Sequence, residues 1–276
     1  MRVQTSGYLF TFSDFKFVLP LSAIGFHDTI VHAPHPWPLA LGLGSCVLYV
    51  LLVALWPRKQ QTVCGSAKNH GVLHHIALFF FSLMTFCLTF YYMILSGDIF
   101  SFTSFLCTPI PGWLRLLSLS FTVSKVWEWG DTLVMLEKGD SLHKIGFLHL
   151  YHHCTTFLLF LCTANFPGAD KSGMLFNAFV HTLMYAHFAW RLPKPLRPLI
   201  TGAQILQLGF VTWFWGLTPS TCPELASFPS AYPVEFWIPY ALVPVYLAFF
   251  LKFFVGSYII RSRKVPVKIL DEAKKK

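Results

Sequence analysis

Residues 125–153 read KVWEWGDTLVMLEKGDSLHKIGFLHLYHH and carry ionisable side chains inside two neighbouring apolar stretches. Such groups are costly in a membrane, so they are candidates for a functional site. Residues three and four positions apart share one face of a helix. The stretches therefore predict a polar stripe that can pair its own charges, followed by a face of imidazoles. The side chains concerned are Lys125, Glu128 and Asp131 in the stripe and His149, His152 and His153 on the imidazole face.

The composition of the whole chain is that of a membrane protein. Of its 276 residues, 55% are hydrophobic and only 12% are charged, and the mean hydropathy is +0.56. These values lie far from those of a soluble domain. The net charge of +9 sits in particular loops and in the tail, without a long basic helix or an RNA-binding motif. We therefore expect no nucleic acid as a partner.

The fold that we predict is an all-α polytopic membrane protein, because an open sheet cannot span lipid and about 20 apolar residues suffice for a helix to cross it. Residues 1–37 form a lumenal or interfacial N-terminal segment, residues 38–260 a domain of seven transmembrane helices, and residues 261–276 a basic cytosolic tail. The predicted spans are 38–56, 73–95, 112–136, 145–164, 172–190, 196–216 and 234–260.

Charge in the loops predicts the orientation, because loops rich in Lys and Arg stay in the cytosol. The loops after the first and fifth spans carry Lys or Arg and no acidic residue. The loop after the sixth span carries Glu224 and Glu235 and no basic residue. This alternation predicts a lumenal N-terminus and a cytosolic C-terminus.

Polar stripes recur on four successive predicted spans. Unpaired polar groups are expensive in lipid, so the stripes should face one another across the interior of the bundle. The simplest arrangement is an enclosed polar chamber that is open to the cytosol. Besides the two stripes above, the residues concerned are Thr132 on the third span, Asn177, His181 and Tyr185 on the fifth, and Thr201, Gln204 and Gln207 on the sixth.

The residues alone leave several chemistries open. A di-iron desaturase or hydroxylase needs about eight imidazoles in several boxes, and His70, His74 and His75 offer a further group, which we place in a cytosolic loop at the mouth of the second span. Metal-free acyl transfer needs an imidazole as nucleophile or base. A proton-linked transporter or receptor also fits, and each stripe has a purely structural alternative in helix packing.

Four motifs, taken together, resemble the ELO family of very-long-chain fatty acid elongases, the membrane 3-ketoacyl-CoA synthases. The resemblance covers residues 38–260, which would form the catalytic domain. One departure is Ala186-His187-Phe188, where the family usually has two tyrosines after Met-Tyr-x. The motifs are Lys125-x-x-Glu128-x-x-Asp131-Thr132, the histidine box His149-x-x-His152-His153, Asn177-x-x-x-His181-x-x-Met184-Tyr185, and Thr201-x-x-Gln204-x-x-Gln207.

The resemblance implies a reaction without a cofactor or a metal. His152 would attack an acyl-CoA thioester to give an acyl-imidazole, and malonyl-CoA would then lose carbon dioxide and take the acyl group. His181 would position the malonyl thioester with help from Asn177, and His149 and His153 would orient His152 or shuttle protons. The substrate-facing groups implied are Lys125, Glu128, Asp131, Asn177, Tyr185, Gln204 and Gln207.

Substrate and partner expectations follow from charge and from the resemblance. Lys194 and Arg197, in or beside a basic cytosolic loop, are candidates to bind CoA phosphates. Gly130 and the stretch 144–153 look closer to the saturated and monounsaturated branch of the family. The expected partners are acyl-CoA, malonyl-CoA, membrane lipid and the reductases and dehydratase of the elongation cycle, and a homodimer stays open.

Cysteine positions and the tail give further expectations. If the compartment is the endoplasmic reticulum, its lumen permits disulfides, and we predict a Cys107–Cys222 bridge between two lumenal loops. Cys154, directly after the histidine box, is a rival nucleophile, although a thiol in an apolar helix is usually inert. The lysines at 274–276 resemble a dilysine signal for retrieval to the endoplasmic reticulum only imperfectly, and a basic tail at the anionic cytosolic leaflet is the alternative.

Overall fold

A computed structural model describes residues 11–12, 15–16, 37–57, 65–163, 166, 168–193, 195–231 and 233–260. Nearly all of this described part is helical, which confirms the predicted all-α class. Its strands are β1 (Thr11–Phe12) and β2 (Phe15–Lys16), which pair antiparallel. The basic tail, Cys64 and Lys194 lie outside the described residues, as does nearly all of the N-terminal segment.

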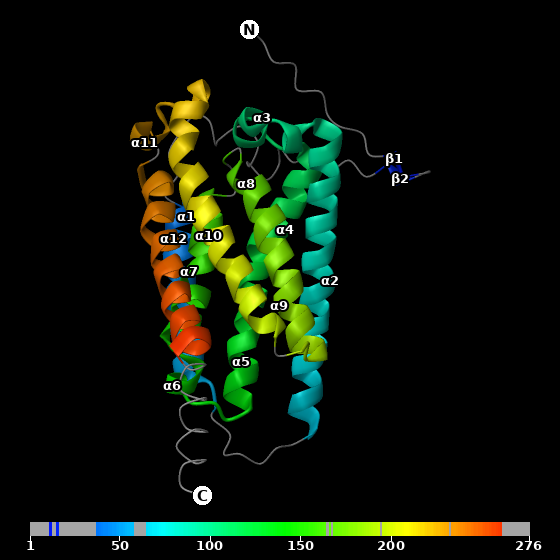
Figure 1. Ribbon diagram of the computed structural model, residues 1–276, viewed down its shortest axis with the longest axis vertical. Coiled ribbons are helices and arrows are strands. Elements are labelled where there is room, and N and C mark those ends of the chain that lie inside the picture. Colours follow the sequence, from blue (N-terminus) through cyan, green and yellow to red (C-terminus); the bar gives the residue numbers. More distant parts are fainter. Residues whose placement is uncertain are drawn as a thin grey trace, which may run out of the picture.

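The molecule is a bundle of long helices that run side by side along its long axis (Figure 1). Helix α2 packs on α9, α1 on α7, and α10 on α12. The long helices are α1 (Trp37–Leu55), α2 (Gly65–Ser96), α4 (Gly112–Trp127), α5 (Trp129–Glu137), α7 (Phe147–Thr163), α9 (Ala178–Trp190), α10 (Leu196–Thr221) and α12 (Pro233–Phe254).

Short helical segments connect the long helices. The α-helical ones are α3 (Phe102–Cys107), α6 (Leu142–Ile145), α8 (Ala169–Ser172) and α11 (Phe228–Ala231). The 3₁₀ turns are η2 (Asp98–Phe100) and η4 (Pro223–Leu225), and the π-helical turns are η3 (Gly173–Asn177) and η5 (Val255–Ile260). Helices α3 and α11 lie at the upper end of the bundle in Figure 1, and α6 lies at the lower end.

Three helical segments of the described chain are long and apolar enough to cross a membrane, namely Pro38–Leu55, His70–Ser96 and Pro233–Ile260. The four other predicted spans are also helical. However, α4, α7 and α9 have only 16, 17 and 13 residues, fewer than the about 20 needed to span lipid. Two of these spans are longer in total, because α4 continues into α5, and α8 and η3 precede α9.

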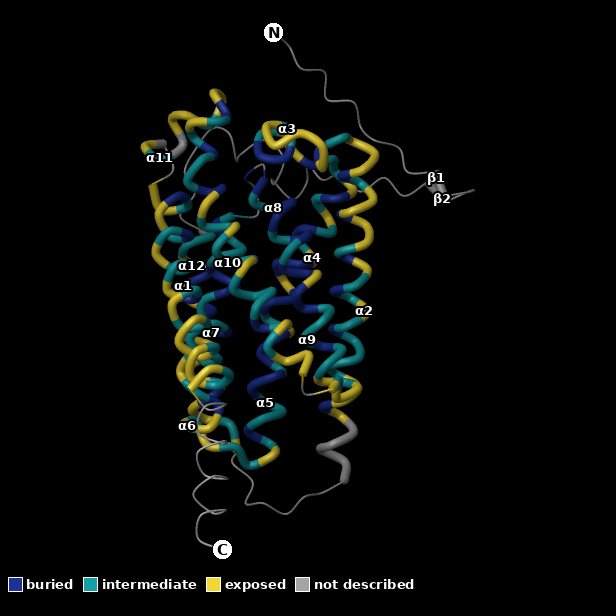
Figure 2. The backbone as a smooth tube through the Cα atoms, viewed as in Figure 1, coloured by how far each residue is buried: buried dark blue, intermediate teal, exposed yellow. Residues whose placement is uncertain are grey.

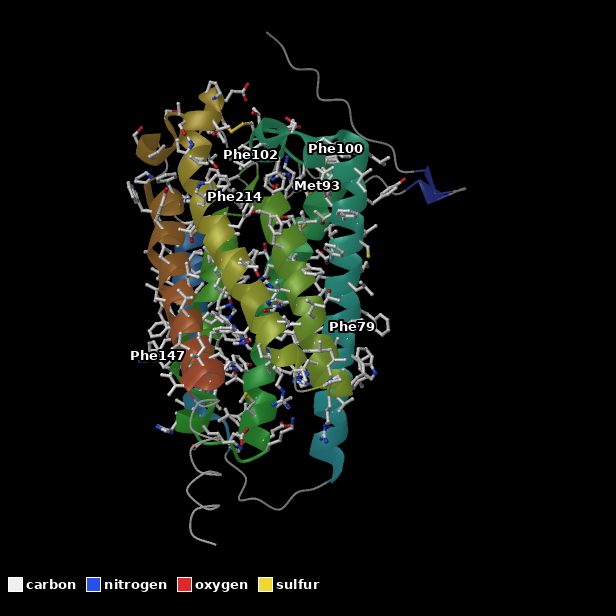
Figure 3. All side chains as sticks on the ribbon, viewed as in Figure 1. Phe79, Met93, Phe100, Phe102, Phe147 and Phe214 are labelled. Carbon is white, nitrogen blue, oxygen red and sulfur yellow. A yellow bond between two sulfur atoms is a disulfide. The ribbon has the colours of Figure 1, made fainter. Side chains whose placement is uncertain are left out.

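Many of the exposed residues are large and apolar. The buried residues lie mainly on the inner parts of the bundle (Figure 2). Figure 3 labels Phe100 and Phe147, whose exposed fractions are 82% and 63%, together with Met93 and Phe214, which are buried. Such an outward distribution suits a protein whose solvent is lipid.

The regular helices break at two positions that carry candidate site residues. Helix α4 ends and α5 begins at Glu128, where the Asp131 amide donates to the Glu128 carbonyl, three residues back instead of four. The π-helical turn η3 ends at Asn177. Single-turn π segments inside helices are frequent at functional sites.

A disulfide and an ion pair connect separate segments at the end of the bundle that holds α3. Cys107 at the end of α3 and Cys222 at the end of α10 form a disulfide, which is the pairing we predicted (yellow bond in Figure 3). Nearby, the buried Lys171 ammonium donates to Asp98 Oδ2 at 2.8 Å. Cys46, Cys87, Cys154 and Cys162 are free, as expected.

Candidate active site

Two polar stripes predicted from the sequence face each other in the interior. The first lies on α4 and α5, and the second on η3 and α9. Three pairs join them in the order of the chain: Lys125 Nζ donates to Asn177 Oδ1 at 2.9 Å, His181 Nδ1 lies 3.3 Å from Glu128 Oε1, and Tyr185 Oη donates to Asp131 Oδ2 at 2.9 Å. Each pair lies one turn or nearly one turn from the next, so the helical spacing of both motifs produces the match.

Lys125 is the deepest charge of the site, with an exposed fraction of 1%. Its ammonium donates to Glu128 Oε1 at 2.6 Å and lies 4.2 Å from the centre of the Phe121 ring. A buried ammonium without such partners would be prohibitively costly. The predicted pairing within the stripe is therefore present between Lys125 and Glu128, whereas Asp131 binds other residues.

The histidine box on α7 divides into two environments. His149 Nε2 lies 2.9 Å from Thr132 Oγ1, and its ring centre is 4.2 Å from that of His153. His153 is buried, and its backbone carbonyl accepts a hydrogen bond from the indole N–H of Trp129 at 2.9 Å. His152 instead lines a cavity, where its ring centre is 5.1 Å from that of Tyr246.

The cavity has an empty volume of about 690 Å³ and brings the stripes of several helices together. At the histidine level its lining includes Lys125, His152, Asn177, His181 and Gln207. From there it continues along mostly apolar side chains to Ala169, Trp215 and Pro239. A few polar groups at one level of an apolar cavity are typical of a site that orients one functional group of a long apolar ligand.

Other predicted residues lie away from this cavity or contact it indirectly. Gln204 Nε2 lies 3.9 Å from Met184 Sδ, and the Thr201 hydroxyl donates to the Arg197 carbonyl within α10. The Arg197 side chain is exposed at the start of α10. Cys154 does not belong to the cavity lining, and its thiol faces α1, where it donates to the Cys46 carbonyl at 3.8 Å.

The predicted loop position of His74 and His75 was wrong. They lie inside α2, which begins at Gly65. Their Nε2 atoms are 3.0 Å and 3.5 Å from Asp131 Oδ1. Two adjacent histidines at the border of an apolar segment were the signal that could have found them, because an ionisable group there needs a buried partner. Tyr49, which contacts Thr132 Oγ1 at 2.9 Å, and Tyr246 carried no such signal.

The sequence around this site is related to that of a known protein family. A family model described as the GNS1/SUR4 (ELO) family matches residues 34–266. The chain belongs to this family. Together with the three apolar helices, membership makes this ELO protein a multi-pass membrane protein.

Several proteins named as fatty acid elongases are similar to this ELO chain over part of their length. A Caenorhabditis elegans protein named putative fatty acid elongase 4 is 29% identical over 56% of this chain and 54% of its own length. Fatty acid elongase 6 of Leishmania major is 32% identical over 56% of this chain and 40% of its own length. Human very long chain fatty acid elongase 4 is 23% identical over 84% of this chain and 73% of its own length. The chain thus spans about half the length of the first two relatives.

Proposed function

We propose that this protein is a fatty acid elongase that condenses acyl-CoA with malonyl-CoA to give a 3-oxoacyl-CoA two carbons longer, carbon dioxide and CoA. The observation that carries the proposal is the position of His152, a nucleophile that lines a largely apolar cavity beside His181, Lys125 and Asn177. The named relatives support the reaction class. The comparisons lend no support to the desaturase alternative.

The first half-reaction forms an acyl-imidazole. The lone pair of His152 attacks the thioester carbon, the carbon–sulfur bond breaks, and the proton lost from the imidazole leaves on the CoA thiol. An N-acyl imidazole hydrolyses readily, so the reaction needs a cavity that excludes water. The apolar lining beyond His152 suits that need and would hold the acyl chain.

The second half-reaction uses malonyl-CoA as the carbon nucleophile. Loss of carbon dioxide leaves the bonding electron pair as an enolate, which attacks the acyl carbon and releases His152. The imidazole regains its proton from solvent. His181, whose Nδ1 lies 3.3 Å from Glu128 Oε1, would orient the malonyl thioester, and Asn177, which lines the same cavity, would hydrogen-bond nearby. His149 and His153 would orient His152 or move protons.

The membrane arrangement is part of the proposal. All seven helical spans would cross the membrane of the endoplasmic reticulum, with the N-terminus lumenal and the C-terminus cytosolic. The end with the Cys107–Cys222 disulfide would then face the lumen, where disulfides persist. The chamber would open to the cytosol, on the side from which CoA esters arrive.

Further substrate contacts and partners complete the proposal. Lys194 and Arg197 would bind CoA phosphates, since guanidinium and ammonium groups attract them. Tyr185, Gln204 and Gln207 would shape the chamber, and the preferred chains would be saturated or monounsaturated. The reductases and dehydratase of the elongation cycle would take the product, and no metal or cofactor would be needed.

The test is a condensation assay on the purified protein in detergent. A panel of acyl-CoAs is incubated with labelled malonyl-CoA, with a chelator present and oxygen absent, for wild type and His152→Ala. We expect a labelled 3-oxoacyl-CoA from wild type and none from the variant. A product that forms only after iron and oxygen are restored would overturn the proposal in favour of di-iron chemistry.

A further inference from the structure

Thr156 lies one helical turn beyond His152 on α7 and lines the same cavity. Its exposed fraction is only 3%, yet within the described part of the chain its hydroxyl oxygen has no hydrogen-bond partner. Buried hydroxyls without a partner are rare in folded proteins, and each one calls for a physical reason. A ligand that occupies the cavity would supply the missing partner.

Most other threonines in the long helices behave differently. Their hydroxyls donate to the carbonyl four residues earlier, which is the usual way to satisfy a threonine in an apolar helix. The threonines that do so are Thr85, Thr89, Thr122, Thr155, Thr163, Thr182, Thr201, Thr212 and Thr218. The Thr156 hydroxyl, in contrast, does not donate to the carbonyl four residues earlier in its own helix.

Thr163 gives the closest comparison. It lies on the same helix and lines the same cavity, but its hydroxyl donates to the Leu159 carbonyl at 3.0 Å. Thr156 and Thr163 thus share a helix and a cavity but lie at different distances from the nucleophile. Thr156 is four residues from His152, a rise of about 6 Å.

Several other polar atoms at this level have partners, although the ring nitrogens His153 Nδ1 and His181 Nδ1 also have no hydrogen-bond partner in the described chain. The Asn177 carbonyl oxygen accepts from Lys125, and the Lys125 ammonium also donates to Glu128. Within the described chain, the Thr156 hydroxyl is the neutral donor on the same helix face as His152 that remains uncommitted. A neutral donor next to a nucleophile suits an oxygen that gains charge only during the reaction.

We propose that Thr156 is a catalytic residue that donates a hydrogen bond to the carbonyl oxygen of the acyl thioester. This inference rests on the proposed function. When His152 attacks, the carbonyl oxygen becomes an oxyanion, and the hydroxyl stabilises it while keeping its proton. Collapse of the intermediate restores the carbonyl as CoA leaves.

The test measures acylation alone, in a single turnover with acyl-CoA and no malonyl-CoA, by the mass of the intact protein over time. Thr156→Val keeps the shape and removes the donor, and Thr156→Ser keeps the donor. The control is Thr89→Val, a buried threonine outside the cavity lining whose hydroxyl donates to the Thr85 carbonyl at 2.8 Å. We expect Thr156→Val to acylate about 100-fold more slowly, with an unchanged half-saturating acyl-CoA concentration. Thr156→Ser should stay within a few fold of wild type, and Thr89→Val should match wild type.

A melting curve separates catalysis from folding. Thr156→Val removes an unsatisfied buried hydroxyl, so its melting temperature should equal or exceed that of wild type. Acylation of Thr156→Val at the wild-type rate, or an equal loss in Thr89→Val, would overturn the inference while leaving the elongase proposal intact. A wild type that forms no acyl-enzyme would instead overturn the covalent step on which the inference rests.

Discussion

At the scale of single residues, the site contains buried charged side chains, and each is stabilised by a polar or charged partner. Lys125, Glu128 and Asp131 are each at most 5% exposed, and each contacts a polar group on another helix or an ion of opposite charge. Removing one member leaves the other uncompensated, which costs about 3–5 kcal/mol for a buried pair.

We predict that Lys125→Met lowers the free energy of unfolding by about 3–5 kcal/mol and abolishes activity. Lys144→Met is the matched control, because Lys144 also pairs with a nearby acid, Asp140, but is 70% exposed. That pair should contribute about 0–1 kcal/mol. Denaturant titration in detergent micelles measures both, and equal losses would contradict the role given to burial.

The residues of the site were largely predictable from the sequence, because ionisable groups are costly in apolar segments and helical spacing places them on one face. The Lys125 and Asn177 motifs were expected to meet, and they do. The partners of Asp131 were not predictable, because His74 lies 57 positions earlier in the chain, with His75 next to it, and no local spacing links them. Thr156 was missed because a threonine in an apolar helix ordinarily bonds to its own helix.

At the scale of elements, the histidine box depends on how closely α7 approaches α1. A β-carbon built on Gly42 would lie 3.0 Å from Leu158 Cα and 2.4 Å from its Cδ1. Small residues allow such close approach between membrane helices. The missing side chain at Gly42 therefore fixes the distance of α1 from the helix that carries His152.

We predict that Gly42→Leu pushes α1 away from α7 and costs about 1–3 kcal/mol through overpacking, together with a loss of activity. Gly44→Leu on the same helix is the control, since nothing in the described chain lies within 4 Å of a β-carbon there. Melting temperature and condensation rate should fall for the first variant and stay near wild type for the second. The reverse order would contradict the packing argument.

The ranges of the helices were predictable from hydropathy, whereas their interruptions were not. Composition locates an apolar run but does not reveal the break at Glu128 or the π-helical turn that ends at Asn177. Both depend on contacts with other helices. They occur at residues of the two polar stripes that face each other in the site.

At the scale of the whole molecule, the bundle is closed at one end by covalent and ionic bonds. The Cys107–Cys222 disulfide links residues 115 positions apart, and the Lys171–Asp98 pair lies nearby. Phe214, in the lining of the cavity, packs in the same apolar cluster as Cys222. The cavity therefore reaches the apolar cluster at the end of the bundle that holds the disulfide.

We predict that the Cys107→Ser/Cys222→Ser double variant loses about 2–4 kcal/mol of stability. A reductant should lower the melting temperature of wild type to that of the double variant, without further effect on the variant. Cys87→Ser, which removes an exposed free thiol, should melt like wild type. A reductant effect that persists in the double variant would show that another bond is responsible.

The central claim is that His152 carries the acyl group. The most direct measurement is to incubate the protein with acyl-CoA alone, digest it and locate the acyl group by mass spectrometry of the peptides. The account predicts one acyl group on the imidazole of His152, chased off by malonyl-CoA. An acyl group on Cys154, or condensation at full rate with no acylated peptide, would contradict it.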